Sequence, residues 1–254
     1  MIAILSPSKT LNEDTKLVTN EYTVPDFPDR SRELVETLRD YSTKDLEKLM
    51  SINPKLAELN VERYMQWNTP FKTETAKPAL LMFKGEVYNG LRADELNEKD
   101  LLFAQDHVRI LSGLYGILRP LDLIMPYRLE MGTKLKTGKG NDLYEFWGNQ
   151  LTEKLNEAFH DHKEKVLINL ASNEYVKALN TDELKVRIIN IQFKEEREGT
   201  YKFITVYGKN ARGLMTRFMI RNRIEIADDL KSFDLDGYFL NQELSKEDDW
   251  VFTR

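Results

Sequence analysis

The sequence has no cysteine among its 254 residues and only three histidines. The lack of cysteine excludes disulfide bonds, thiolate zinc sites, cysteine-ligated iron–sulfur clusters and cysteine nucleophiles. His160 and His162 flank an aspartate in a polar segment, and His107 stands alone. The histidines therefore show neither metal-ligand spacing nor a Ser–His–Asp arrangement. We expect no cofactor and no tight metal site.

Long apolar runs are also missing. No stretch approaches the roughly 18 apolar residues that a membrane helix needs. The N-terminal residues MIAILSPSKT have no basic region and too few apolar residues for a signal peptide. These absences predict a cytoplasmic protein without a membrane partner.

The residues that are present are typical of a globular chain, because 41% are hydrophobic and 31% are charged. The formal net charge is −5 at pH 7. An acidic chain does not attract nucleic acid over its whole surface. Any site for a polyanion must therefore be a local basic patch.

Hydrophobic patterning predicts the main elements. Apolar runs predict buried strands at residues 1–5, 79–83 and 166–171. Alternating residues predict a hairpin from 186–194 and 201–207 that turns at Glu198-Gly199, and a last strand near 250–252. Helical periodicity predicts helices at 29–41, 43–51, 54–67, 98–111, 142–159 and 209–222. No repeat or flexible linker interrupts the chain, so we predict a single mixed α/β (α+β) domain over 1–254, with helices around a central sheet.

A basic segment near the C-terminus stands out in this acidic chain. Residues 199–224 contain no acidic residue and six basic ones: Lys202, Lys209, Arg212, Arg217, Arg221 and Arg223. Helical spacing places Ala211, Leu214, Met215 and Phe218 on one face of this segment. One interpretation is a basic helix that lines a phosphate-binding cleft. The other is an ordinary amphipathic helix with a solvated basic side, and the pattern leaves both open.

Polar residues follow two of the predicted strands, in SPSKT (6–10) and INLASNEY (168–175). Ligands of open α/β sheets gather at the carboxyl ends of strands, so these loops are candidate sites. Together with Glu130, they offer Lys9, Ser172, Glu174 and Tyr175 for acid–base chemistry. The alternative interpretation is that Lys9 is merely solvated and that Ser172 or Asn173 caps a short helix.

The stretch QDHVRILSGLYGILRPLDLIMPYRLEMG (105–132) combines three glycines, two prolines and three arginines. Gly113 and Gly116 at the end of a predicted helix could turn backbone N–H groups toward a phosphate, with Arg109 and Arg128 adding charge. The alternative is a glycine that stops the helix before a proline-directed loop.

Several long segments resemble one family, the bacterial YaaA-like peroxide-stress proteins. They are SPSKTL (6–11), FKGEVYNGL (83–91), LSGLYGILRPLDLIMPYRLEMG (111–132), LYEFWG (143–148), INLASNEY (168–175) and KNARGLMTRF (209–218). The resemblance runs from the first strand to GYF at 237–239. It implies a cytoplasmic protein of the response to hydrogen peroxide that lowers free intracellular iron and protects DNA. It also implies a single-domain α/β fold with a positively charged cleft, a helix-hairpin-helix-like element and DNA binding.

The resemblance places the helical hairpin at Gly113 to Gly116. The nucleic-acid-binding residues that it implies are Lys9, Lys84, Arg109, Gly113, Gly116, Arg128, Lys209, Arg212 and Arg217. The expected partner is double-stranded or distorted DNA, bound without catalysis. The alternative function is an enzyme that acts on a nucleotide, base or nucleic acid through the strand-end loops around Lys9, Glu130 and Ser172.

Overall fold

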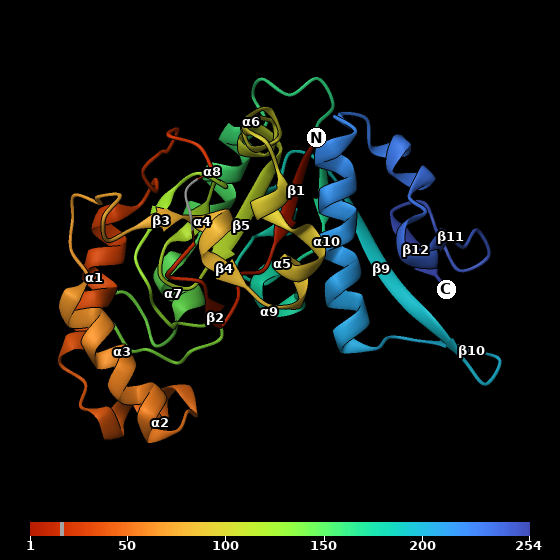
Figure 1. The fold of residues 1–254 in the computed structure, drawn as a ribbon. Coiled ribbons are helices and arrows are strands. Elements are labelled where there is room, and N and C mark those ends of the chain that lie inside the picture. The colour runs from red at the N-terminus through yellow and green to blue at the C-terminus, as the bar shows by residue number, and fades with distance from the viewer. Residues whose placement is uncertain (16–17) are drawn as a thin grey trace.

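The computed structural model describes residues 1–15 and 18–254, and its centre is a mixed β-sheet (Figure 1). Strand β1 (Ile2–Leu5) pairs in parallel with β5 (Val108–Ser112) on one side and with β8 (Val166–Asn169) on the other. Beyond β8, strands β9 (Arg187–Arg197) and β12 (Asp249–Thr253) continue the parallel order. The antiparallel partners are β6 (Gly116–Leu118) on β5, β10 (Thr200–Lys202) on β9 and β11 (Phe239–Leu240) on β12.

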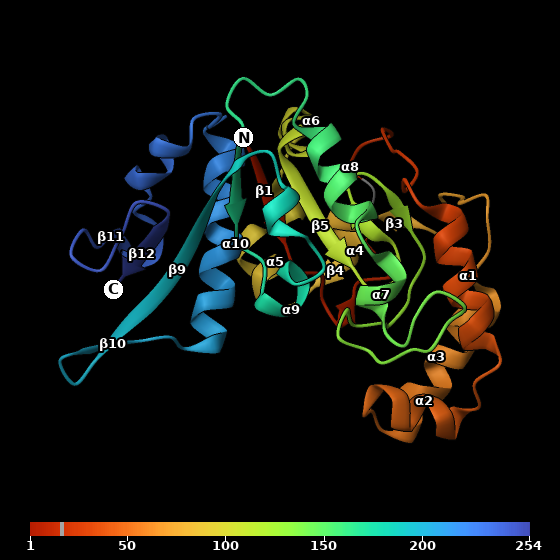
Figure 2. The same ribbon diagram turned by 180° about the vertical axis from the view of Figure 1, so that it is seen from behind.

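Helices cover both faces of the sheet. Their bounds agree best with the predicted bounds in the first three helices of the chain. On one face lie α5 (Glu86–Leu91), α6 (Glu98–His107) and α10 (Thr205–Arg221) (Figure 1). On the other lie α7 (Leu143–Trp147), α8 (Gln150–Ala158) and α9 (Asn173–Val176) (Figure 2). A lateral group contains α1 (Pro28–Arg39), α2 (Thr43–Met50) and α3 (Pro54–Gln66).

The remaining elements are short. Outside the sheet, β2 (Thr10–Leu11) pairs with β4 (Phe83–Lys84), and β3 (Lys77–Pro78) pairs with β7 (Leu123–Ile124). One helical turn, α4 (Ala79–Met82), precedes β4. The 3₁₀ turns are η1 (Ala93–Glu95), η2 (Thr181–Glu183), η3 (Ala227–Ser232) and η4 (Leu235–Gly237).

The central strands follow from their composition. Every residue of β1 is buried, as expected for a parallel strand that is covered on both faces. In β9 the alternate residues Ile189, Ile191 and Phe193 are buried, whereas Gln192 is exposed. The predicted mixed α/β architecture with a central sheet is therefore confirmed. In the described part of the chain, no helix is both long and apolar enough to cross a membrane.

Five predicted elements were wrong in kind or length. Residues 79–82 are helical, and the helix predicted at 98–111 ends at His107 because the next residues join the sheet as β5. The helix predicted at 142–159 is broken at Gly148, whose φ is 50°. The second hairpin strand ends at residue 202, and α10 begins at 205, earlier than predicted.

Sheet order places a ligand crevice at β1. The chain passes from β1 to its parallel neighbour β5 on one side and returns later to β8 on the other side, so the order of the strands reverses at β1. In open α/β sheets, such a switch point leaves a crevice outside the carboxyl ends of the strands. The loops 6–10 and 170–175 follow β1 and β8 at this edge.

Candidate functional site

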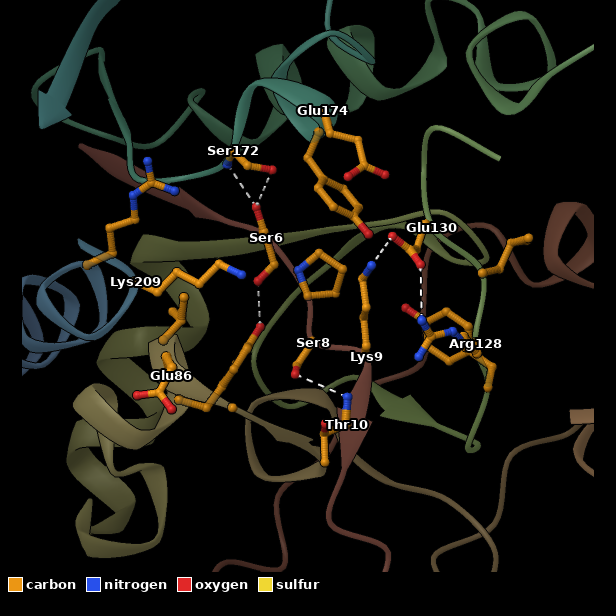
Figure 3. A pocket seen from close by; sticks show the side chains of 18 residues that line it. Ser6, Ser8, Lys9, Thr10, Glu86, Arg128, Glu130, Ser172, Glu174 and Lys209 are labelled. Carbon is orange, nitrogen blue, oxygen red and sulfur yellow. Dashed lines mark hydrogen bonds and ion pairs between the residues drawn. The ribbon is translucent and has the colours of Figure 1, made fainter. Parts of the chain in front are cut away.

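A cavity of about 450 Å³ opens at the carboxyl ends of β1 and β8 (Figure 3). Its lining comes from five separate segments: residues 6–10, 85–88, 127–130, 172–175, and Lys209 with Arg212 of α10. This volume lies in the range of pockets that bind small molecules. The parallel sheet therefore brings together residues that are far apart in the sequence.

The loop after β1 is fixed by hydrogen bonds to its neighbours. Ser6 Oγ accepts the Ser172 N–H at 2.8 Å, and the Tyr88 hydroxyl donates to the Ser6 carbonyl at 2.9 Å. Ser8 Oγ donates to the Lys84 carbonyl. Gly85 has a φ of 130°, and a Cβ at this position would lie 2.8 Å from Ser8 Oγ, so only glycine suits this turn. These contacts hold Lys9 at the mouth of the cavity.

Lys9, Glu130 and Arg128 form an ion-paired group inside the cavity (Figure 3). The Lys9 Nζ lies 2.5 Å from Glu130 Oε2, and an Arg128 guanidinium nitrogen lies 3.3 Å from Glu130 Oε1. Arg128 is the more buried cation, and its Nε has no hydrogen-bond partner among the described residues. A carboxylate and an ammonium group in contact are a pair of the kind that acid–base catalysis uses.

The segment after β8 supplies Ser172, Glu174 and Tyr175. Ser172 occupies the cap position of α9 but makes no capping hydrogen bond, and its hydroxyl lies 3.2 Å from that of Ser6. The Glu174 carboxylate accepts the Gly132 N–H at 3.0 Å. Burial is the main cause that raises the pKa of Tyr175, and the charges of Glu174 and Glu130 add to it. The side chain of Ser172 thus joins the cavity instead of capping the helix.

Helix α10 supplies Lys209 and Arg212 to the lining of the cavity. Lys209 lies across the cavity from Arg128 and Glu130 (Figure 3). The helix can approach α5 because both carry glycine at the contact. A Cβ on Gly213 would lie 1.8 Å from the Val87 carbonyl oxygen, and one on Gly90 would lie 2.2 Å from the Asn210 carbonyl oxygen. Burial lowers the pKa of the Arg212 guanidinium, which lies over the ring of Phe203 at 6.0 Å.

All five catalytic candidates, Lys9, Glu130, Ser172, Glu174 and Tyr175, line this cavity. Of the residues expected to bind nucleic acid, Lys9, Arg128, Lys209 and Arg212 line it as well. Three acidic side chains, Glu86, Glu130 and Glu174, also face it, so the charge of the lining is mixed. Among the described residues, the cations without an ion-pair partner in this lining are those of α10, Lys209 and Arg212.

Three other expected nucleic-acid contacts lie outside the cavity. Lys84 lines a neighbouring cavity of about 170 Å³. Arg109 donates to the carbonyls of Gln105 and Val108 at 2.8 Å, and burial lowers its pKa to about 10. Arg217 donates to the Leu91 carbonyl at 3.1 Å and to Glu95 at 2.8 Å. Arg109 and Arg217 thus satisfy much of their hydrogen-bonding capacity within the protein.

Gly113 and Gly116 lie in a turn between the antiparallel strands β5 and β6. The helical hairpin predicted here is wrong, because the residues before the turn join the sheet. A Cβ on Gly113 would lie 2.4 Å from the Leu129 carbonyl oxygen, and Gly116, with a φ of 74°, lies against Trp147. Both glycines are buried and required by packing.

The sequence interpretation missed Glu86, Tyr88 and Tyr127 as cavity residues. Their signal lay in the motifs FKGEVYNGL and PYRLEMG, which pointed to a family but to no chemistry for these positions. The strand predicted at 79–83 also gave no indication that a helix, α5, begins after Gly85. The start of this helix places Glu86 in the lining of the cavity.

A third cavity, of about 480 Å³, contains the N-terminal amine and two histidines. The amine lies 3.1 Å from His162 Nδ1, and His107 Nδ1 lies 2.8 Å from the Met1 carbonyl oxygen. Burial, then the nearby charges of the amine, His107 and Arg109, lower the pKa of His162 to about 4, while a hydrogen bond with Asp106 opposes them.

We expect the protein to lose stability between about pH 6.5 and pH 4. In this range the unfolded state binds a proton at His162 more readily than the folded state, so acid favours unfolding. Because His162 is half-buried, solvent screening limits its share to about 1 kcal/mol. Urea unfolding at pH 7.0 and at pH 4.5 measures this loss of stability. In His162→Gln the loss should be smaller, and an unchanged loss would contradict this assignment.

Comparison with known proteins identifies the same family as the motifs that line the cavity. The family model for peroxide stress protein YaaA matches residues 1–244. A relative from Aliivibrio fischeri, named UPF0246 protein, is 48% identical over 254 residues, which cover all of this chain and 98% of the relative. The chain therefore belongs to the peroxide stress protein YaaA family, which suggests a role in oxidative stress.

Proposed function

We propose that this protein binds DNA during oxidative stress, through a surface formed by Tyr201, Phe203, Tyr207, Lys209 and Arg212. We call it the aromatic–basic surface. The observation that carries the proposal is the exposure of its three aromatic side chains, at 41%, 52% and 39%. They precede the two α10 cations along the chain. Phe203 lies beneath the Arg212 guanidinium, and Tyr207 lies beneath that of Arg254 at 5.0 Å.

Exposed aromatic rings beside cations suit unpaired bases. Bases stack on aromatic side chains regardless of sequence, at about 1–3 kcal/mol per base, while cations contact the phosphates. Among the described residues, neither Lys209 nor Arg212 has a carboxylate within 4.0 Å, although Glu86 lines the same cavity, so both cations can contact phosphates. The protein as a whole carries a net charge of −5, which confines DNA to this patch. We propose distorted DNA, with its unstacked bases, as the preferred partner over perfect duplex.

Binding measured by fluorescence anisotropy over a range of salt concentrations tests this proposal. Lys209→Ala/Arg212→Ala should weaken binding by about tenfold or more and reduce the salt dependence by about two phosphate contacts. Phe203→Ala/Tyr207→Ala should reduce the preference for a DNA bubble over a duplex. Lys44→Ala/Lys55→Ala removes the same charge from exposed positions on α2 and α3 and serves as the control. Equal affinity of the first variant and the control would refute the proposal.

We also propose that the protein lowers free intracellular iron, as the resemblance of its motifs to peroxide-stress proteins implies. Among the residues that the structure describes, no three histidine or acidic side chains are grouped as a site for a metal ion. Anaerobic titration calorimetry with ferrous iron distinguishes direct binding by this chain from an effect through another component.

The second candidate function is an enzyme that acts on a nucleotide, base or nucleic acid. It is favoured by the convergence of Lys9, Glu130, Ser172, Glu174 and Tyr175 on one cavity. Glu130 would remove a proton from the attacking group, and Lys9 would donate one to the leaving group. Their contact of 2.5 Å places the two groups within reach of the same substrate atoms.

A further inference from the structure

Arg212 differs from the other arginines of α10 in its lack of a partner. Arg217 is paired with Glu95 at 2.8 Å, and Arg221 is paired with Asp100 at 3.0 Å. In the described residues, the Arg212 guanidinium has neither a carboxylate within 4.0 Å nor a hydrogen-bond acceptor, and its Nε is fully buried. The charge of Arg212 is therefore uncompensated within the described part of the chain.

Arg212 is partly buried, and an unpaired charge there is costly, so an anion from outside the chain is its natural partner. Burial lowers the pKa of Arg212, and no acidic group opposes this effect. Lys209, one helical turn earlier, also lines the cavity and adds a second cation without an ion pair in the described structure. An arginine beside a lysine suits a phosphate group, because the guanidinium can donate two parallel hydrogen bonds.

The other walls of the cavity suit a flat aromatic ring. Tyr88, Tyr127 and Tyr175 line it and are buried. The Tyr88 hydroxyl is bound to the Ser6 carbonyl and that of Tyr127 lies 2.7 Å from Ser112 Oγ, so these two rings are held in place. Glu130 lies at the same wall and offers a polar contact to the edge of a ring.

We propose that this cavity is a nucleotide site, with the phosphate bound by Arg212 and Lys209 and the base between the tyrosines and Glu130. The cavity volume of about 450 Å³ is suited to one nucleotide. This nucleotide is either a free monophosphate or an unpaired nucleotide of DNA that swings out of the helix into the cavity. The DNA source rests on the proposed function, whereas the free monophosphate does not.

Titration calorimetry with the full chain tests the site. The probes are the deoxynucleoside 5′-monophosphates, the matching nucleosides and inorganic phosphate. At least one monophosphate should bind about tenfold or more tightly than its nucleoside. Arg212→Gln should weaken the binding of that monophosphate by about 10- to 100-fold, because charge-assisted hydrogen bonds are lost. Arg212→Lys should weaken its binding less, because the positive charge is kept. Thermal melting confirms that each variant is folded, and Lys44→Ala/Lys55→Ala should bind as the wild type does.

A fluorescent base analogue at a mismatch in duplex DNA tests the second source. Its fluorescence should change on binding to the wild type but not to Arg212→Gln. Either signal supports the site. Monophosphate binding identifies a free monophosphate as its ligand, and the fluorescence change identifies an unpaired nucleotide of DNA. DNA binding without either signal overturns the nucleotide site and leaves the proposed function standing. Monophosphate binding without DNA binding supports the site and refutes the proposed function.

Discussion

Replacing Gly213 by alanine is expected to lower the free energy of unfolding by about 3 kcal/mol or more. The new Cβ would lie 1.8 Å from the Val87 carbonyl oxygen and 2.7 Å from the Leu91 nitrogen. Both atoms belong to the backbone of α5, so no side-chain rotation relieves the overlap, and the two helices must separate. Gly90 makes the reciprocal contact with the Asn210 carbonyl oxygen, at 2.2 Å. The helices therefore meet backbone to backbone.

The same substitution should also weaken ligand binding, because α5 and α10 form two walls of the cavity. α5 supplies Glu86 and Tyr88, and α10 supplies Lys209 and Arg212. Urea unfolding measures the stability. Gly138→Ala is the matched control, since a Cβ there has no neighbour within 4 Å and should change stability little. Equal stability of the two variants would mean that α10 does not depend on this close approach.

The elements that could be predicted from the sequence carry strong local signals. Asn53-Pro54 starts α3, with the Asn53 side chain accepting the Leu56 N–H at 2.9 Å, and Ser42 forms a capping box with Asp45. Where prediction failed, tertiary packing overrode the local pattern. Residues 108–112 continue a helical pattern, but pairing with β1 and β6 makes them a strand.

The site was predictable where it depended on strand ends. Lys9 and Ser172 follow β1 and β8, and parallel pairing of these strands places both at one edge of the sheet. The charge pattern alone was a poorer guide. Arg212 and Arg217 lie on the same helix, yet one faces the cavity and the other is paired with Glu95. A sequence shows charge, but not the acidic partner that would neutralise it.

If the cavity is an enzyme active site, Glu130→Gln is expected to reduce turnover by about 100- to 10,000-fold, the usual contribution of a positioned acid or base. Glutamine keeps the size of Glu130 but cannot take a proton. A panel of nucleosides, nucleotides and oligonucleotides with damaged bases, with products followed by mass spectrometry, supplies the substrate. Glu157→Gln, which changes an exposed carboxylate paired with Lys154 at 3.1 Å, is the control.

A second substitution separates a catalytic pair from a merely structural ion pair. If Glu130 and Lys9 take part in the same proton transfers, the double variant Lys9→Met/Glu130→Gln should be hardly slower than either single variant. The effects of substituting residues that act as a unit are not additive. Independent roles would instead multiply the two losses. Stability provides the contrast, since Lys9 is 59% exposed and its ion pair contributes at most about 1 kcal/mol. A large loss of turnover with a nearly unchanged free energy of unfolding therefore assigns a catalytic role to the pair. A wild type that converts no member of the panel refutes the proposal that the cavity is an enzyme active site.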